Sequence, residues 1–391
     1  MEKKKLTPQL RFPEFKNAGE WEERTIEDIV IAESSTLALN KLNLKSNGYP
    51  IYGADGIIGY IDDFQQIDKY ISIVKDGSGV GRLALCEGKS SILGTLQYLK
   101  SRDPEDYDLT WVYYLLNTVN FSSFIKGSGI PHIYYSDYKN ENIALPSLPE
   151  QQKIASCLSS LDEVIELHTQ KLELLQEHKK GLLQNLFPQE GETVPRVRFP
   201  EFEGDGEWDT KTLDELGELV NGLTYSPKDV RNEGLLVLRS SNIQNGIIDF
   251  NDCVYVRSDI KGANLSRPKD ILICVRNGSK RLIGKNAIIP ENIPLATHGA
   301  FMTVFRASNP DFVFQLFQSD AYDRQVKADL GATINSINGK NFIKYEFAVP
   351  SNPQEQQKIA SCLSSLDEAI EAQAEKIEQL KMHKKGLMQG L

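Results

Sequence analysis

Several short segments contain residue types that serve catalysis in other proteins, and their spacing decides whether they could work here. The segment GSGVG at 77–81 has the spacing GxGxG, whereas phosphate-binding loops need GxxxxGK[ST], or GxGxxG between a strand and a helix. The five histidines are scattered and show neither HxxxH nor HExxH spacing. The sequence therefore predicts a polar turn at 77–81 and neither a catalytic nor a metal site on this chain.

Basic side chains gather in one part of the chain, where they could neutralise phosphate groups. The segment 257–285 carries eight Lys or Arg residues and two Asp, although the whole chain has a net charge of −10. A local basic patch attracts nucleic acid even on an acidic protein. An ordinary solvated loop is the alternative. The block 25–148 holds 10 basic and 15 acidic residues and gives no electrostatic support of this kind.

Two copies of one pattern divide the chain. The motif RFPEF occurs at 11–15 and again 187 residues later, at 198–202. The segment EQQKIASCLSSLDE at 150–163 recurs without a change 205 residues later, at 355–368. Two copies with so long a period are too few for a solenoid, so the sequence predicts a tandem duplication with a pseudo-two-fold axis.

The two long blocks between the repeated motifs hardly match each other. Both mix short runs of strand-forming residues, separated by Gly and Asn turns, with helical stretches. We therefore expect two compact α+β domains of about 120–140 residues, each large enough to fold alone. The strand-like runs include 49–60, 70–74 and 271–275, and the helical stretches include 109–117 and 312–327.

A loop near the end of each block shows a further correspondence. Residues 129–133 align with residues 333–337, and Tyr138 aligns with Phe342. Loops rich in Gly, Ser, Asn and His suit contacts with phosphates and base edges. They suit plain turns equally well.

The segments 150–186 and 355–391 carry apolar residues at alternating steps of four and three, which is the heptad pattern of a coiled coil. Pro149 and Pro353 stand just before the predicted helices, and Pro188 ends the first. A helix of this length is a rod of roughly 55 Å. The predicted seam consists of Ile154, Leu158, Leu161, Ile165, His168, Leu172 and Leu175 in the first helix, and of Ile359, Leu363, Leu366, Ile370, Gln373, Ile377 and Leu380 in the second.

One polar residue interrupts each seam at the same place, His168 in the first helix and Gln373 in the second. If the helices pair antiparallel and centred, these two side chains face each other and fix the register. A surface-leaning histidine without such a partner is the alternative.

The composition predicts an ordinary soluble globular protein. No apolar run approaches the ~20 residues of a membrane span, and no export signal follows the first residues. The five cysteines form no CxxC pair, so a disulfide framework is not expected and a reducing cytoplasm is the predicted location.

The duplicated RFPEF motifs, the two divergent blocks and the repeated helices with HKKGL resemble the specificity subunit of type I restriction–modification systems. The second block adds GLTYSPKD at 222–229 and LRSSNI at 238–243, which are similar to the start of that family's target-recognition domains. The resemblance extends over essentially the whole chain. It implies a sequence-specific DNA-binding subunit, not an enzyme, in which each target-recognition domain reads one half of a bipartite, asymmetric DNA site.

The resemblance also implies an α+β fold with two target-recognition domains in pseudo-two-fold tandem repeat, separated by a long antiparallel helical coiled coil that sets the DNA spacer. We expect the first target-recognition domain at 1–148, the first long helix at 149–187, the second domain at 188–350 and the second long helix at 351–391.

The implied partners are double-stranded DNA, two methyltransferase subunits docked on the repeated helices, and motor–nuclease subunits. S-adenosylmethionine, ATP and Mg would then belong to the partner subunits, with no cofactor on this chain and no membrane. The predicted DNA contacts are Tyr52, Asp55, Lys75, Ser78, Arg82, Gln97, Ser128, His132 and Tyr134 in the first domain, and Arg239, Ser240, Asn242, Arg276, Asn277, Lys280, Arg281, His298, Asn335, Ser336 and Lys340 in the second.

Three other functions remain open from the sequence. A recognition subunit of a different restriction or methylation system would also bind DNA but would work with a different enzyme. A coiled-coil scaffold with two protein-binding heads would show little salt dependence in DNA binding. A nuclease would cleave DNA in the presence of a metal ion without any partner subunit.

Overall fold

The computed structural model describes residues 6–127, 129–330 and 335–391. The chain forms two compact units, which we call unit 1 (Met1–Thr169 with Glu375–Leu391) and unit 2 (Gln170–Ala374). Each unit contains one divergent block, and the division between the units cuts both long helices, α4 (Leu148–Leu186) and α9 (Pro353–Gly390).

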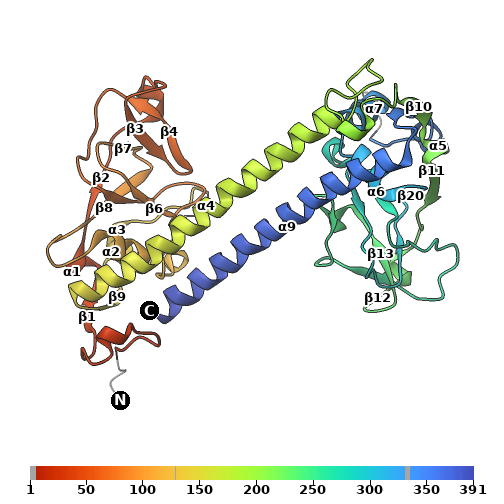
Figure 1. Cartoon of the computed structure of the whole chain (residues 1–391). Helices are drawn as coiled ribbons and strands as arrows, with labels where there is room; N and C mark the ends of the chain where they lie inside the picture. The colour runs from red at the N-terminus through yellow and green to blue at the C-terminus, as the bar shows by residue number, and fades with distance from the viewer. Residues whose placement is uncertain (1–5, 128, 331–334) are drawn as a thin grey trace. The chain divides into compact units, whose positions relative to one another are not determined.

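Unit 1 is built on a four-stranded sheet in the order β2-β8-β5-β6, with a smaller sheet β4-β3-β7 and a strand pair β1-β9. Figure 1 shows these strands in red to yellow. The strands are β1 (Glu22–Thr25), β2 (Val30–Ser34), β3 (Tyr49–Gly53), β4 (Gly56–Ile61), β5 (Tyr70–Val74), β6 (Leu83–Cys86), β7 (Ser91–Ile92), β8 (Leu96–Ser101) and β9 (Asn142–Leu145), and the short helices are α1 (Ile26–Ile29), α2 (Leu109–Leu116) and α3 (Tyr135–Tyr138).

Unit 2 repeats this plan, with the sheet β11-β20-β17-β18, a second sheet β12-β16-β13-β19 and the pairs β10-β21 and β14-β15. Its strands are β10 (Asp209–Thr212), β11 (Gly217–Asn221), β12 (Val230–Arg231), β13 (Leu235–Leu238), β14 (Ile243–Gln244), β15 (Ile247–Ile248), β16 (Val254–Val256), β17 (Ile271–Cys274), β18 (Asn286–Ile288), β19 (Ala296–His298), β20 (Met302–Ala307) and β21 (Glu346–Val349). Its short helices are α5 (Leu213–Leu216), α6 (Pro310–Leu316), α7 (Asp320–Asp329) and α8 (Gly339–Phe342).

The core of each unit lies where the main sheet meets a helix. All residues of β5 and β17 are buried, as their mainly apolar sequences predict, and the buried set includes the polar Ser72 of β5. Trp111 and Val112 of α2 pack on β5, and Phe312 of α6 belongs to the same core cluster as Ile271 and Ile273 of β17. The predicted helical stretch 312–327 proves to be two helices, because the chain turns at Ser319, whose hydroxyl donates to the Leu316 carbonyl.

The repeated sequence motifs meet as a buried ion pair in each unit. In unit 1, Arg11 Nε and Nη2 donate to the two carboxylate oxygens of Glu150, both at 2.7 Å. In unit 2, Arg198 makes the same two bonds to Glu355, also at 2.7 Å. Bidentate pairing of this kind fixes orientation as well as distance. The RFPEF and EQQK motifs thus contact each other in both units. This contact explains why both motifs are the same in the two copies.

The two long helices run antiparallel within each unit. In unit 1, Lys384 of α9 donates to Asp162 of α4 at 2.7 Å, and in unit 2 Lys179 of α4 bonds Asp367 of α9. These two bonds occupy equivalent positions of the repeat. The C-terminal turns of one helix pack with the N-terminal turns of the other in both units.

Residues at the predicted seam positions are buried or half-buried, whereas residues between them, such as Glu163 and Lys171, are exposed. His168 belongs to unit 1 and Gln373 to unit 2, so their facing each other stays a prediction. One detail differs from the expectation: Pro149 and Pro353 lie inside the first helical turn, not before it. A first-turn proline is tolerated because its missing N–H has no helical partner.

None of the helices in the described ranges carries a stretch apolar enough to cross a lipid bilayer.

Candidate nucleic-acid interface

Two loops of unit 1 are joined by backbone hydrogen bonds at one end of the main sheet. The amides of Lys75 and Asp76 both donate to the Thr95 carbonyl, at 2.9 and 3.2 Å, and the Ile133 amide donates to the Lys75 carbonyl at 2.9 Å. A further bridge joins Asp76 to His132. The loop after β5 and the loop before α3 therefore form one continuous surface.

Unit 2 builds the same loop surface from different residues. The amides of Val275 and Arg276 both donate to the Phe301 carbonyl, at 3.0 and 3.1 Å, and the Ile337 amide donates to the Val275 carbonyl at 2.8 Å. A bridge joins Arg276 to Ser336. At residues 336 and 337, the alignment of this loop with its counterpart before α3 is thus confirmed.

Equivalent backbone positions of the two surfaces carry chemically different side chains. A carboxylate in one unit corresponds to a guanidinium in the other, and a hydroxyl corresponds to an aromatic ring. Such a pair of surfaces can present different hydrogen-bonding groups to DNA from one kind of scaffold. The corresponding pairs are Asp76 with Arg276, Thr95 with Phe301, and His132 with Ser336.

In unit 1 a third loop joins this surface through an exposed ion pair. Arg82 Nη1 donates to the Ala54 carbonyl at 3.1 Å and also to the Asp55 carboxylate. The Arg82 and Asp55 side chains are 54% and 89% exposed, so water and ligands reach both. The structure thus brings together two predicted contacts from separate loops.

The other predicted DNA contacts of unit 1 differ in how far their side chains are exposed. The rings of His132 and Tyr134 lie 5.1 Å apart, and Tyr134 is exposed. Lys75 is half-buried, with Nζ 3.9 Å from the Asp76 carboxylate. Ser78 is exposed at the tip of its loop.

Two predicted contacts of unit 1 lie within strands, not on a loop. Tyr52 in β3 and Gln97 in β8 are half-buried, and burial raises the pKa of the Tyr52 hydroxyl. Ser128 lies outside the described residues.

Unit 2 has a polar and aromatic depression beside its loop surface. A pocket of about 530 Å³ is lined by residues that include Arg239, Ser240, Tyr225 and Phe301. Arg239 is held at its rim by an ion pair with Asp252, at 2.7 Å. The pocket thus combines a guanidinium and a hydroxyl with aromatic faces, the groups that suit base edges and base stacking.

Polar side chains around this pocket are linked to one another. Asn277 Nδ2 donates to Ser240 Oγ at 3.1 Å, and Asn335 Nδ2 donates to the Gly278 carbonyl at 3.2 Å. The guanidinium of Arg276 lies 5.7 Å from the centre of the Phe301 ring. The structure brings five predicted contacts into one cluster: Arg276, Ser240, Asn277, Asn335 and Ser336.

The remaining predicted cations of unit 2 are exposed. Lys280 and Arg281 lie on the short turn after the Arg276 loop, and Lys340 lies on α8. Elsewhere the basic segment 257–285 is partly neutralised, since Arg257 pairs with Asp229 and Lys269 pairs with Asp311. The segment therefore presents less free positive charge than its composition suggests.

Two predicted contacts are corrected by the structure, because both side chains are completely buried. Asn242 donates to the carbonyls of Asp249 and Asp252, at 2.9 and 3.0 Å, and so closes the loop after β13. His298 bonds Ser266 Oγ at 3.2 Å and the Val220 carbonyl at 2.9 Å. Burial lowers the pKa of His298. Both residues hold the scaffold and cannot reach DNA from these positions.

The sequence reasoning missed the aromatic residues of the pocket. Phe301 is 59% exposed, although a phenylalanine next to an apolar strand is expected in the core. Tyr225 lies within the GLTYSPKD segment at 222–229, whose resemblance to the start of a target-recognition domain is a signal for it in the sequence.

Comparison with known proteins shows one family over both units. The model of the type I restriction modification DNA specificity domain matches residues 18–177 and 205–382. The type I restriction enzyme MjaVIII specificity subunit of Methanocaldococcus jannaschii is 27% identical over 331 residues, 81% of this chain and 77% of that protein. The EcoKI specificity subunit of Escherichia coli K12 is 28% identical over 184 residues, 44% of this chain and 39% of that protein.

Solved structures show the same fold. The type I restriction–modification S subunit from M. genitalium superposes with a TM-score of 0.67 at 19% identity, covering 98% of both chains. A chain from a study of complex assembly and conformational transition of a type I system superposes with a TM-score of 0.54 at 15% identity, covering 94% of this chain and 96% of that chain. This chain therefore belongs to the type I restriction modification DNA specificity domain family.

Proposed function

We propose that this chain is the DNA specificity subunit of a type I restriction–modification system and that its two loop surfaces each read one half of a bipartite, asymmetric site. The observation that carries the proposal is the common backbone scaffold with different side chains in the two units. Identical scaffolds with identical side chains would favour a palindromic site. Arg276 in the place of Asp76 favours different half-sites.

The proposal gives the paired helices a separate role. Many residues of α4 and α9 that are exposed in both copies are identical, as in Lys153 and Lys358 or His178 and His383. A repeated exposed surface suits two identical partners, and we assign it to two methyltransferase subunits. The length of the helices would then set the unread DNA between the half-sites.

Chemistry in this proposal lies on the partner subunits. The methyltransferase subunits would bind S-adenosylmethionine and methylate an adenine that is turned out of the duplex. Motor–nuclease subunits would use ATP and Mg for translocation and cleavage. This chain would contribute DNA recognition alone.

The decisive experiment maps methylated adenines across a genome in cells that express this chain together with the methyltransferase encoded beside it. Control cells carry the methyltransferase alone. We expect a new bipartite, asymmetric motif only when this chain is present. Co-purification of the two proteins without any new motif would contradict the proposal and would favour a protein-binding scaffold.

A further inference from the structure

The loop surface of unit 2 exposes a phenylalanine among its polar groups. Phe301 lies on the tight turn between β19 and β20, in which the Met302 amide donates to the Gly299 carbonyl at 2.8 Å. The Phe301 side chain is 59% exposed, while its carbonyl is held by the amides of the Arg276 loop. The backbone scaffold therefore fixes this ring at the surface.

The same turn in unit 1 carries a threonine. There the Leu96 amide donates to the Leu93 carbonyl at 2.9 Å, and the Thr95 carbonyl accepts two amide hydrogen bonds, as the Phe301 carbonyl does in unit 2. Thr95 is exposed as well. The fold accepts either a hydroxyl or an aromatic ring at this position, so the scaffold itself does not require the ring.

Phe301 also lines the pocket of about 530 Å³ beside the loop surface. The apolar part of the lining includes Leu223 and Met302, which are almost completely buried, and the half-buried Tyr225. The centre of the Phe301 ring lies 5.7 Å from the guanidinium of Arg276. Neighbouring base pairs are about 3.4 Å apart along the duplex, so the ring and the guanidinium can reach the same base pair or adjacent ones.

The base edges of B-DNA offer one apolar group to such a ring. In the major groove they present hydrogen-bond donors and acceptors, and the C5-methyl group of thymine is the exception. In the minor groove they present donors and acceptors alone. An apolar ring exposed beside a base-reading guanidinium therefore has a single complementary group on the base edges.

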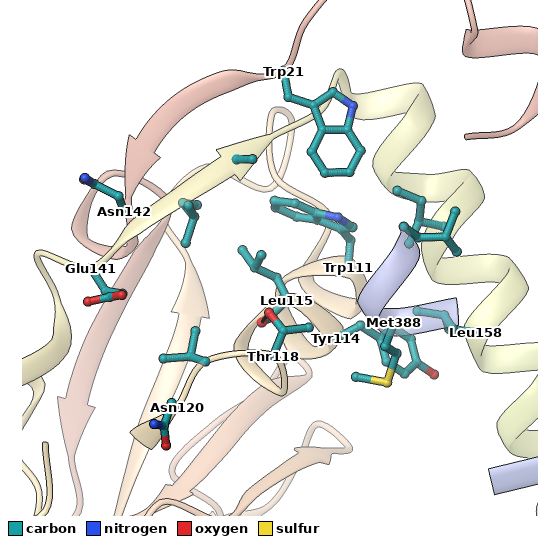
Figure 2. A pocket seen from close by; sticks show the side chains of 15 residues that line it. Trp21, Trp111, Tyr114, Leu115, Thr118, Asn120, Glu141, Asn142, Leu158 and Met388 are labelled. Carbon is teal, nitrogen blue, oxygen red and sulfur yellow. Dashed lines mark hydrogen bonds between the residues drawn. The ribbon is translucent and has the colours of Figure 1, made fainter. Parts of the chain in front are cut away.

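The pocket in Figure 2 belongs to unit 1 and is a different feature. Its volume is about 480 Å³, and its lining includes Trp21, Trp111 and Met388. Among the described residues, this lining shares none with the loop surface of unit 1. The aromatic ring on the loop surface of unit 2 is thus a property of its recognition loops.

We propose that Phe301 is a specificity-determining residue of unit 2 and that its ring recognises the C5-methyl group of a thymine within one base pair of the pair read by Arg276. This inference rests on the proposed DNA-recognition function and adds the chemical class of the base. A 5-methylcytosine carries the same methyl group, and the test separates the two bases.

The test uses the chain assembled with the methyltransferase encoded beside it, and duplexes that contain the mapped motif. The half-site of unit 2 is the half that changes with Arg276→Ala. Each thymine of that half, on either strand, is replaced in turn by deoxyuridine, which lacks only the methyl group. Competition binding at fixed salt should show a position at which the replacement weakens binding roughly three- to tenfold.

Variants of residue 301 locate the contact. Phe301→Thr copies the residue of unit 1 at an exposed position and should bind the thymine and deoxyuridine duplexes equally, whereas Phe301→Leu should keep part of the preference. Leu295→Ala is the matched control, because it removes an apolar side chain, 62% exposed, at the other end of β19. This control should keep the whole preference. Equal binding of both duplexes by the unchanged chain, or a full preference in Phe301→Thr, overturns the proposal.

A cytosine arm separates the methyl group from the rest of thymine. At the position found above, a C·G pair in place of T·A should weaken binding, and 5-methylcytosine in that pair should recover roughly threefold. The recovery should be lost in Phe301→Thr. Absence of any recovery in the unchanged chain would show that the A·T pair is recognised by another feature, which overturns the role of the methyl group.

Failure of this inference is distinguishable from failure of the proposed function. Without a new methylation motif, the specificity function itself is contradicted before any duplex is made. A motif that is present but insensitive to deoxyuridine contradicts the role of Phe301 and leaves that function intact.

Discussion

Asp76 and Arg276 occupy the same position of two equivalent loop scaffolds. Each forms a β-bridge with a residue of the loop that precedes a short helix. Asp76 pairs with His132 in unit 1, and Arg276 pairs with Ser336 in unit 2. Their amides donate to equivalent carbonyls, at 3.2 Å to Thr95 and 3.1 Å to Phe301. A reversal of charge at one backbone position is the sharpest chemical difference between the two surfaces.

This relationship predicts that each residue affects only one half-site. Replacing Arg276 by Ala should relax the motif in the half read by unit 2, with a loss of about 1–3 kcal/mol of discrimination at one base pair. Replacing Asp76 by Ala should change the other half. Methylation mapping of both variants measures this, and a change in both halves from one substitution would contradict the assignment of one unit to one half-site.

Arg281 should act through phosphates, because it is exposed on the turn beside the Arg276 loop. Replacing Arg281 by Ala should weaken binding to all DNA sequences alike and lower the slope of log K against log salt by about 1. Fluorescence anisotropy with the assembled methyltransferase, from low to moderate salt, gives this slope. Arg24, exposed on β1 and paired with Glu22, provides the control substitution, for which we expect an unchanged slope.

The ion pair between Arg11 and Glu150 should be a large contributor to the stability of unit 1. Both side chains are nearly inaccessible, at 8% and 1% exposure, so Glu150→Gln leaves a buried guanidinium without its charged partner. We expect a loss of roughly 3 kcal/mol in the free energy of unfolding. Urea titration followed by circular dichroism measures it.

Glu14→Gln is the matched control for that substitution. Glu14 pairs with Lys153 at 3.3 Å, but both side chains are about half exposed, at 48% and 49%. Water screens such a pair, so the loss should be clearly smaller. Equal losses for the two variants would refute the role assigned to burial.

His298 should make unit 2 sensitive to mild acid. Burial lowers its pKa below the ordinary value of 6.5, so the unfolded chain binds a proton at a pH where the folded chain does not. Stability is then complete above about pH 6.5 and falls as the pH drops toward the folded-state pKa. Urea midpoints at pH 7.5 and 5.5 test this, and His298→Asn should show a smaller drop between them. An equal drop in the variant would assign the acid sensitivity to other groups.

The repeated motifs determined the architecture from the sequence alone. The RFPEF and EQQKIASCLSSLDE copies predicted a tandem duplication, and the steps of four and three predicted both long helices and their apolar positions. These patterns are periodic and local, so each follows from the chemistry of neighbouring residues. The mainly apolar segments that form β5 and β17 were predictable for the same reason.

The candidate site was predictable only in part, because a short sequence segment does not determine which of its side chains are exposed. Arg239, Ser240 and Asn242 are close in sequence, yet Asn242 points inward to bond the Asp249 and Asp252 carbonyls. Phe301 is of a residue type that is usually found in the core, yet its side chain lies at the surface. Whether a side chain turns inward depends on which backbone N–H and C=O groups still lack a hydrogen-bond partner once distant segments have paired.

The sequence by itself thus determined the duplication, the helices and the family resemblance, since identical or periodic residues carry them. Only the tertiary structure showed that Asp76 and Arg276 are equivalent, because hydrogen bonds from residues more than 50 positions away, at Ile133 and Ile337, define that equivalence. Only the structure showed that the Phe187 ring packs against Trp208 and Phe312 in the core of unit 2. Both relationships arise from packing between segments far apart in the chain, which no local pattern encodes.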